Sequence, residues 1–252
     1  MIPAWLSFFD ALIALSLFAA GPLGAHFGLF PAFRGFSMFI LGGLVAFLGL
    51  ILGLIGLFFT RRGESRVWRP RAVFGAGVSG LIAALFLVLI VVRFSSGYPP
   101  INDITTDFTD PPEFVHATEV VENSARDMKY NAAKYENAQK QGYAKRPPIG
   151  SMAMDSDTDA TFAKVEALAR QMPSWEISYA DPKTRTIEGV STSSLFRFKD
   201  DFVIRVKPAD NGKSIVDMRS KSRDGIGDFG VNFNRIVDFM ERLQTESGTK
   251  SG

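Results

Sequence analysis

The sequence predicts a membrane-anchored α+β protein, in which a three-helix transmembrane bundle precedes a two-layer domain with an antiparallel four-stranded sheet and two packing helices. Three long apolar runs within the first 94 residues are the first observation that predicts it. The second observation is a group of five arginines between the second and the third run. The third is the order of the remaining patterns, in which a helix, four strands and a helix follow one another.

The apolar runs extend over about residues 5–25, 36–59 and 72–92. Each run is long enough to cross a hydrocarbon core, which takes about 20 apolar residues. The chain start up to Trp5 lacks the positive charges that open a signal peptide, so we expect the first run to be a retained helix. Residues 1–94 are therefore the predicted transmembrane domain, and the lipid bilayer is its expected partner.

The basic residues of the connectors predict how the chain crosses the membrane. The connector after the first run contains one base, Arg34, whereas the connector after the second run contains five bases and one acid, Glu64. The five bases are Arg61, Arg62, Arg66, Arg69 and Arg71. Arginine-rich connectors stay in the cytoplasm. We therefore expect a multi-pass protein of the bacterial inner (cytoplasmic) membrane, with a cytoplasmic N-terminus and a periplasmic C-terminal domain.

Charge and cysteine content exclude several classes of function. Residues 1–94 hold seven of the 28 basic residues and two of the 26 acids, so the C-terminal part carries a small excess of acids. Nucleic-acid binding needs a concentrated positive surface, and we expect no nucleic-acid partner. The chain has no cysteine, which excludes disulfides and cysteine-bound metal, and it has two histidines, His26 and His116. We expect neither a metal site nor a cofactor.

Small residues follow one another at helical spacing in the second and third runs. The two stripes are Gly42, Ala46, Gly49, Gly53 and Gly56, and Ala72, Ala76, Gly80 and Ala84. Small residues let helices approach closely in lipid. The stripes favour a compact three-helix bundle, and a homodimer through the same stripes is the alternative.

Asp10 is a carboxylate about two turns into the first run. An ionisable residue within the membrane is a candidate functional residue. Close to the start of a helix, however, the carboxylate can also reach the headgroups or interact with the positive end of the helix dipole.

The chain after the third run divides by composition. Residues 95–100 are a linker with one glycine and two prolines. Prolines and aspartates prevent a helix at the start of residues 101–150, which we expect to form an extended arm followed by a polar helix at about 122–141. Residues 151–244 are the predicted α+β domain, and residues 245–252 a disordered tail.

Two helices and four strands make up the predicted α+β domain. A capping box of Ser156 and Asp159 opens the first helix, and Asp228 is the expected N-cap of the second. Apolar spacing places these helices at about residues 156–172 and 229–243. Alternation and turn sequences place the strands at about residues 175–179, 184–192, 196–206 and 214–222.

Several motifs after residue 100 are similar to those of a known family. They are residues 101–107, Asp110-Pro111-Pro112 with Phe114, residues 196–201, residues 219–223 and residues 227–236. Together they resemble the bacterial domain-of-unknown-function 1499 family, some members of which carry this domain after a few membrane spans. One loop departs from the pattern: the family often has Ser-Arg-Val-Gly, where Ser222-Arg223 is here followed by residues 224–227. The resemblance implies a fold and a membrane location, and it brings no established activity or catalytic residue.

The best candidate site is a corner made by Arg223, Asp228, Asn232 and Arg235, because the last three share one side of the final helix. One interpretation is a structural clamp, in which Asp228 caps the helix and pairs with an arginine. The other is an anion-binding corner, in which arginines and helix N–H groups bind a carboxylate or a phosphate.

Further candidates are charged residues on the strands and the arm. Arg205, Lys207, Arg219 and Lys221 alternate along two strands, so we expect a basic strip on the solvent side of the sheet. The strip is either ordinary solvation or a surface for anionic lipid headgroups or an acidic partner. Among the acids, Asp103 and Asp107, with Asp110, are either turn residues or a weak calcium site, and Asp200 and Asp201 read as a turn.

Three hypotheses about function follow. The first is a non-catalytic binding or interaction module that presents its periplasmic domain to a protein partner or to an anionic envelope component. The second is a hydrolase or transferase of the envelope that uses Asp103, Asp107 or Asp228, and a deep pocket joining two of these carboxylates would favour it. The third is an accessory subunit of a membrane complex, which a glycine stripe left outside the bundle would favour.

Overall fold

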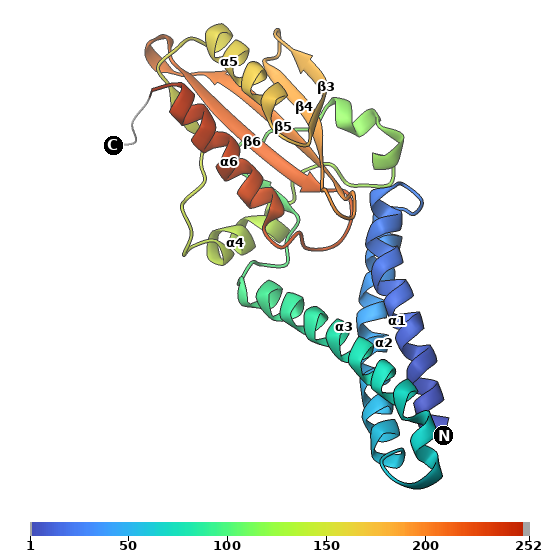
Figure 1. The fold of residues 1–252 in the computed structure, drawn as a ribbon. Helices are drawn as coiled ribbons and strands as arrows, with labels where there is room; N and C mark the ends of the chain where they lie inside the picture. The colour runs from blue at the N-terminus through green and yellow to red at the C-terminus, as the bar shows by residue number, and fades with distance from the viewer. Residues whose placement is uncertain (1, 249–252) are drawn as a thin grey trace. The chain divides into compact units, whose positions relative to one another are not determined.

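The structure is a computed structural model, and it describes residues 2–248. The chain forms two compact units (Figure 1). One contains the residues up to Ser96 together with residues 194–197, and the other contains residues 97–193 and the chain from Phe198 onwards.

Three helices make up the first unit: α1 (Ile2–His26), α2 (Ala32–Phe59) and α3 (Arg69–Ser95), with a 3-10 turn at Gly63–Trp68 before α3. All three are long and apolar enough to cross a membrane, which confirms the predicted transmembrane helices. A helix satisfies its own backbone groups, so such segments are stable in lipid.

The glycines of α2 bring the three helices together. A Cβ atom at Gly42 would come within 2.5 Å of the backbone nitrogen of Phe18 on α1. A Cβ atom at Gly53 would come within 2.6 Å of the backbone nitrogen of Ala76 on α3. The predicted stripe of α2 is thus used within the bundle. The stripe of α3 is only partly buried, since Ala84 is exposed and the buried face of this helix contains Gly75 and Ser79 instead.

The second unit contains an antiparallel sheet of six strands, where the sequence analysis predicted four. The strands are β1 (Asp103–Thr105), β2 (Met152–Met154), β3 (Trp175–Asp181), β4 (Thr186–Thr192), β5 (Lys199–Pro208) and β6 (Ser214–Ser222). Their order is β1-β6-β5-β4-β3, and β2 also pairs with β6. The two additional strands are three residues long, so they show no alternation, and the free edge of β6 determines their conformation.

Helices α5 (Thr158–Gln171) and α6 (Val231–Glu246) cover one face of this sheet (Figure 1), as predicted. Alternate residues of β5, among them Phe202 and Ile204, are fully buried in the core that the helices close. Trp175 packs on Phe202 with ring centroids 4.1 Å apart. The α+β fold is confirmed.

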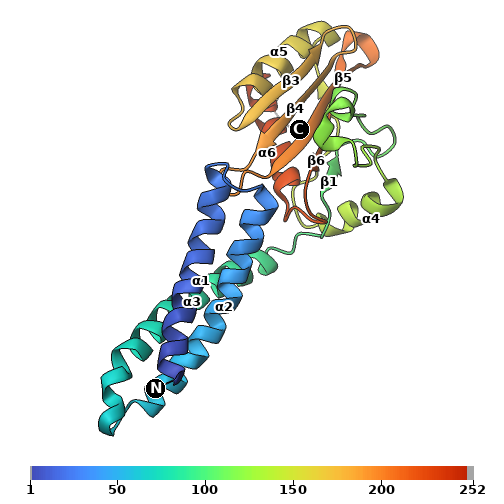
Figure 2. The ribbon, with the colours of Figure 1, turned by 90° about the vertical axis from the view of Figure 1, so that its right-hand side faces the viewer.

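Part of the arm covers the opposite face of the sheet, whereas Tyr135 and Tyr143, in and directly after its α-helix, join the core on the helical side. The arm includes β1, 3-10 turns at His116–Glu119 and Val121–Asn123, and α4 (Ala132–Gly142) (Figure 2). Helix α4 begins ten residues later in the chain than the predicted start of the polar helix. Phe114, Ala117 and Met128 of the arm pack on Val203 of β5 in a second apolar cluster. The prediction that this face of the sheet meets solvent is therefore wrong.

Several boundaries differ from the prediction for local reasons. The N-cap of α5 is Asp157, whose carboxylate accepts from the N–H groups of Asp159 and Ala160, so the proposed capping box with Ser156 is wrong. Helix α6 begins at Val231 because Phe229 and Gly230 adopt positive φ angles of 55° and 84°. Of the predicted disordered tail, residues 245–246 are helical, and residues 249–252 lie outside the described residues.

Candidate anion-binding site

A buried ion pair between β6 and β1 forms the base of the site. Antiparallel pairing aligns Lys221 with Asp103 and Arg219 with Thr105. Arg219 donates from Nε and Nη2 to both carboxylate oxygens of Asp103, each at 2.8 Å, and neither side chain is exposed. It also donates to the carbonyl oxygens of Pro112 and Met128 in the arm. A bidentate pair with these additional bonds positions the arm on the sheet.

Lys221 extends from the same face of β6 toward the surface. Its Nζ lies 2.8 Å from Oδ2 of Asp103, and its side chain is 10% exposed. An ammonium group has three N–H donors, and this ion pair uses one of them.

A second carboxylate, Asp201 on β5, binds two arginines. Arg223, the residue after β6, donates to the Asp201 carboxylate at 2.8 Å, and Arg126 of the arm donates to the same carboxylate at 2.6 Å. Arg126 also donates to the carbonyl oxygen of Ser222 at 2.8 Å. Asp201 is nearly fully buried within β5, so the prediction that it forms a turn is wrong.

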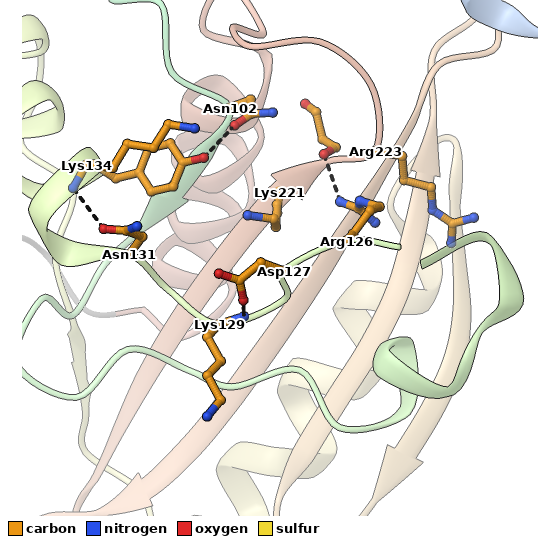
Figure 3. A pocket seen from close by; sticks show the side chains of 10 residues that line it. Asn102, Arg126, Asp127, Lys129, Asn131, Lys134, Lys221 and Arg223 are labelled. Carbon is orange, nitrogen blue, oxygen red and sulfur yellow. Dashed lines mark hydrogen bonds between the residues drawn. The ribbon is translucent and has the colours of Figure 1, made fainter. Parts of the chain in front are cut away.

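These groups line a pocket of about 270 Å³ between β6, the arm and the start of α4 (Figure 3). The lining residues are Asn102, Arg126, Asp127, Lys129, Asn131, Lys134, Tyr135, Lys221, Ser222 and Arg223. Five of them are cations, and Asp127 is the one carboxylate among these described lining residues. Asp103 and Asp201 lie behind the wall, and each is shared by two cations, so an excess of positive charge remains.

The outer rim of the pocket consists of exposed side chains. Lys129 and Lys134 are both exposed to solvent. A hydrogen bond to Tyr135 raises the pKa of Lys134 above its ordinary value. The Tyr135 hydroxyl donates to the side chain of Asn102 at 3.2 Å, and Asn131 accepts from the backbone of Lys134 as the N-cap of α4 (Figure 3).

The predicted corner of four residues is divided between the two faces of the sheet. Arg223 belongs to the pocket, whereas Asn232 and Arg235 lie on the face covered by the helices. Arg235 pairs with Asp200 at 2.5 Å. Asp200 lies in β5 and is buried, which also contradicts its prediction as a turn residue.

Gly230 is the N-cap of the final helix, so the prediction of Asp228 as its N-cap is wrong, but Asp228 binds N–H groups at this end of the helix. Its carboxylate accepts from the backbone of Gly230 at 2.9 Å and of Asn232 at 2.7 Å. Burial raises the pKa of Asp228 above its ordinary value, although these hydrogen bonds oppose the shift. The Asn232 amide donates to Ser222 and to the carbonyl oxygen of Asn102, and so links the corner to the residues behind the pocket.

The predicted basic strip is two separate clusters of ion pairs. Arg219 and Lys221 bind Asp103, as described above. Arg205 and Lys207 contact the fully buried Asp217 at 3.2 and 2.9 Å. The strip is thus not a solvent-facing surface, because the arm supplies or covers the carboxylates that these cations bind.

A comparison with known families agrees with this architecture. A family model described as "Protein of unknown function (DUF1499)" matches residues 103–243, which is more than half of the chain. The chain belongs to the DUF1499 family. No curated protein matches the chain. The DUF1499 match contains both ion-pair clusters and every lining residue of the pocket except Asn102.

Asp103 and Asp107, two of the candidate acids of the DUF1499 domain, belong to different clusters of ion pairs. Asp103 pairs with Arg219, whereas Asp107 and Asp110 bind Lys207 at 3.0 and 3.4 Å. Asp107 also accepts the N–H groups of Thr109 and Asp110, as a turn residue does. Across residues 2–248, no group of three or more His, Cys, Asp or Glu side chains could hold a metal ion.

Eight lining residues of the DUF1499 pocket were not predicted as site residues. Two are Asn102 and Ser222, and the other six come from one segment of the arm: Arg126, Asp127, Lys129, Asn131, Lys134 and Tyr135. A signal was present, because three bases and two tyrosines occur within ten residues. The polar composition of this segment predicted a surface helix instead.

The intramembrane carboxylate lies inside the bundle. Oδ2 of Asp10 is buried beside Gly49 of α2 and the hydroxyl of Ser79 of α3, and a Cβ atom at Gly49 would overlap both. Neither of these two oxygen atoms has a hydrogen bond to another described residue. Ser7 donates to the carbonyl oxygen of Gly49 at 3.1 Å. Asp10 is thus positioned among all three helices, and its functional role stays a prediction.

Proposed function

We propose that this DUF1499 protein is a membrane-anchored binding module without catalytic activity, and that its basic pocket binds an anionic group such as a phosphate. The observation that carries the proposal is the lining of the pocket, in which five cations stand against one carboxylate. Arginine and lysine side chains are the residues that bind phosphate and carboxylate groups.

The carboxylates in and behind the pocket already accept hydrogen bonds, which favours a binding function over a catalytic one. A general base must reach the proton that it removes. Asp103 and Asp201 each accept bonds from two cations, and Asp127 accepts the backbone N–H of Lys129. The alternative, a hydrolase or transferase of the envelope, has less support because Asp103, Asp107 and Asp228 do not share the pocket.

The location is part of the proposal. The bacterial cytoplasmic membrane, a cytoplasmic N-terminus and a periplasmic DUF1499 domain are supported by the five arginines between Arg61 and Arg71. A periplasmic domain would meet anionic components of the envelope or a protein partner. A homodimer, or a role as an accessory subunit, has weaker support because the glycine stripe of α2 packs within the bundle.

Titration of the full-length protein with pyrophosphate tests the proposed function. The protein is placed in bilayer discs of phosphatidylcholine, so that no anionic lipid competes, and binding is measured by calorimetry. The wild type is compared with a double variant, Lys129→Gln and Lys134→Gln. Both lysines are exposed, so we expect these substitutions to leave the fold intact. We expect the double variant to bind about tenfold more weakly, because each exposed charge contact contributes up to about 1 kcal/mol.

The control is Lys183→Gln, which removes an exposed lysine from the turn between β3 and β4. It should leave the affinity unchanged. No saturable binding, or equal loss in the control and the double variant, would contradict an anion site in this pocket.

A further inference from the structure

The loop after β6, together with the first residue of α6, presents apolar side chains to solvent after the strand that lines the basic pocket. Ile226 is 80% exposed, Val231 is 40% exposed and Phe229 is 39% exposed. The exposure of several large apolar groups in one loop marks an interaction surface more often than scattered single residues do.

The polypeptide backbone fixes the shape of this loop. Gly225 O accepts from the side chain of Asn102 at 2.6 Å, and the N–H of Asp228 donates to the carbonyl oxygen of Ile101 at 3.1 Å. The carboxylate of Asp228 then holds the N–H groups of Gly230 and Asn232. The apolar side chains are therefore held outward by a bonded turn.

The apolar loop and the pocket share one edge of the domain. Ser222 and Arg223 line the pocket, and Ile226 follows three residues later. Asn102 lines the pocket and also holds Gly225 of the loop. The backbone that carries the apolar side chains is thus bonded to a residue of the basic pocket, and surfaces that bind anionic membranes combine these two kinds of side chain.

The length of the linker keeps this edge near a bilayer. Helix α3 ends at Ser95, and Ile101, to which Asp228 is hydrogen-bonded, follows six residues later. Six extended residues span at most about 22 Å. This bound holds for every orientation of the domain. One headgroup region is about 5–8 Å thick, since a bilayer with a core of about 30 Å is about 40–45 Å thick in total, so the bilayer surface lies within the reach of the linker.

We infer that the pocket binds the phosphate of an anionic phospholipid from the bilayer that the helices span, with the loop around Ile226 inserted among its acyl chains. This inference rests on the proposed function and names the source of the anion. Lys129, Lys134 and Lys221 then contact the headgroup, and Ile226 and Val231 contact the start of the acyl chains. A free anion in the periplasm would bind the cations of the pocket, and the loop around Ile226 would stay exposed to water.

The absence of cysteine from the sequence allows a direct test in the full-length protein. Ile226→Cys is labelled with an environment-sensitive fluorophore and placed in discs of phosphatidylcholine alone or of phosphatidylcholine mixed with phosphatidylglycerol. We expect a blue shift of the emission, and quenching by spin labels on the acyl chains, in the discs that contain phosphatidylglycerol. The matched control, Lys183→Cys, should report water in both discs.

Two further arms separate the inference from the proposed function. Adding Lys129→Gln and Lys134→Gln to the labelled protein should abolish the blue shift. Phosphatidylglycerol should also weaken binding of pyrophosphate, because both occupy one pocket. If pyrophosphate binds but the label stays in water and phosphatidylglycerol does not compete, the lipid inference is wrong and the proposed function stands. If pyrophosphate does not bind either, both are wrong.

Discussion

Arg219 of β6 and Asp103 of β1 form an ion pair in which neither side chain has any exposure to solvent. Between them they join the edge of the sheet, the arm and the wall of the pocket, because Arg219 also binds two arm carbonyl oxygens and Asp103 also binds Lys221. A charge buried without its partner is strongly unfavourable. The pair therefore connects the stability of the domain with the geometry of the pocket.

Asp103→Asn is expected to destabilise the DUF1499 domain by about 3–5 kcal/mol, because it leaves the guanidinium group of Arg219 buried without a counter-charge. Chemical unfolding of the full-length protein in detergent measures this loss. Asp159→Asn is the control, since it removes an exposed acid that pairs with Arg185 and should cost no more than about 1 kcal/mol. Equal effects of the two variants would contradict the structural role of Asp103.

Arg235→Ala is expected to lower the free energy of unfolding by about 1–3 kcal/mol, because buried Asp200 loses its hydrogen-bonded partner. Arg242→Ala removes an arginine from the same helix, but from an exposed pair with Asp238, and should have little effect. Thermal unfolding of both variants provides the comparison. An unchanged stability of Arg235→Ala, together with altered binding of pyrophosphate, would instead indicate a functional role.

Asp228 predicts a dependence of stability on pH. Burial raises its folded pKa above the ordinary value of 3.8, so the folded state holds its proton more strongly than the unfolded state does. Its contribution to stability is therefore largest below that value and is lost as the pH rises through the folded pKa.

The difference in unfolding free energy between the wild type and Asp228→Asn isolates this contribution, because the asparagine does not titrate. We expect the difference to shift against the wild type as the pH rises from about 3.8, the unfolded value. A difference that shifts in favour of the wild type over the same range would show a lowered pKa and contradict the account.

Gly42→Leu is expected to disrupt the helix bundle, because its side chain would meet the backbone of Phe18. Overpacking of this kind costs about 1–3 kcal/mol. Gly77→Leu is the control within the bundle, since a Cβ atom there has no described neighbour within 4 Å. In detergent, Gly42→Leu should lose its helical circular dichroism at a lower temperature than the wild type, whereas Gly77→Leu should not. An equal effect of Gly77→Leu would indicate that this side of α3 packs against another chain.

The repeating patterns of the sequence predicted the scaffold well. Unbroken apolar runs predicted the three membrane helices, and the apolar spacing in residues 156–172 and 229–243 predicted the two helices that cover the sheet. These elements are determined by local periodicity. The two additional strands were not predicted, because segments such as Asp103–Thr105 depend on the edge of β6 that they pair with.

The candidate site could be predicted only in part for the same reason. Lys221 and Arg223 were recognised as candidates, and both line the pocket. The arm that completes the pocket has no periodic pattern, so neither Arg126 nor its bond to Asp201 could be placed from the sequence. The same arm covers Arg219, which alternation alone assigned to solvent.

Locating a bound anion in the structure tests the central claim most directly. Crystals of the full-length protein would be soaked with tungstate, a phosphate-like anion with a strong anomalous signal. The account predicts a peak inside the pocket, within hydrogen-bonding distance of Lys221 and near Lys129 and Lys134. A peak at another site, or an empty pocket at a concentration that saturates binding, would contradict it.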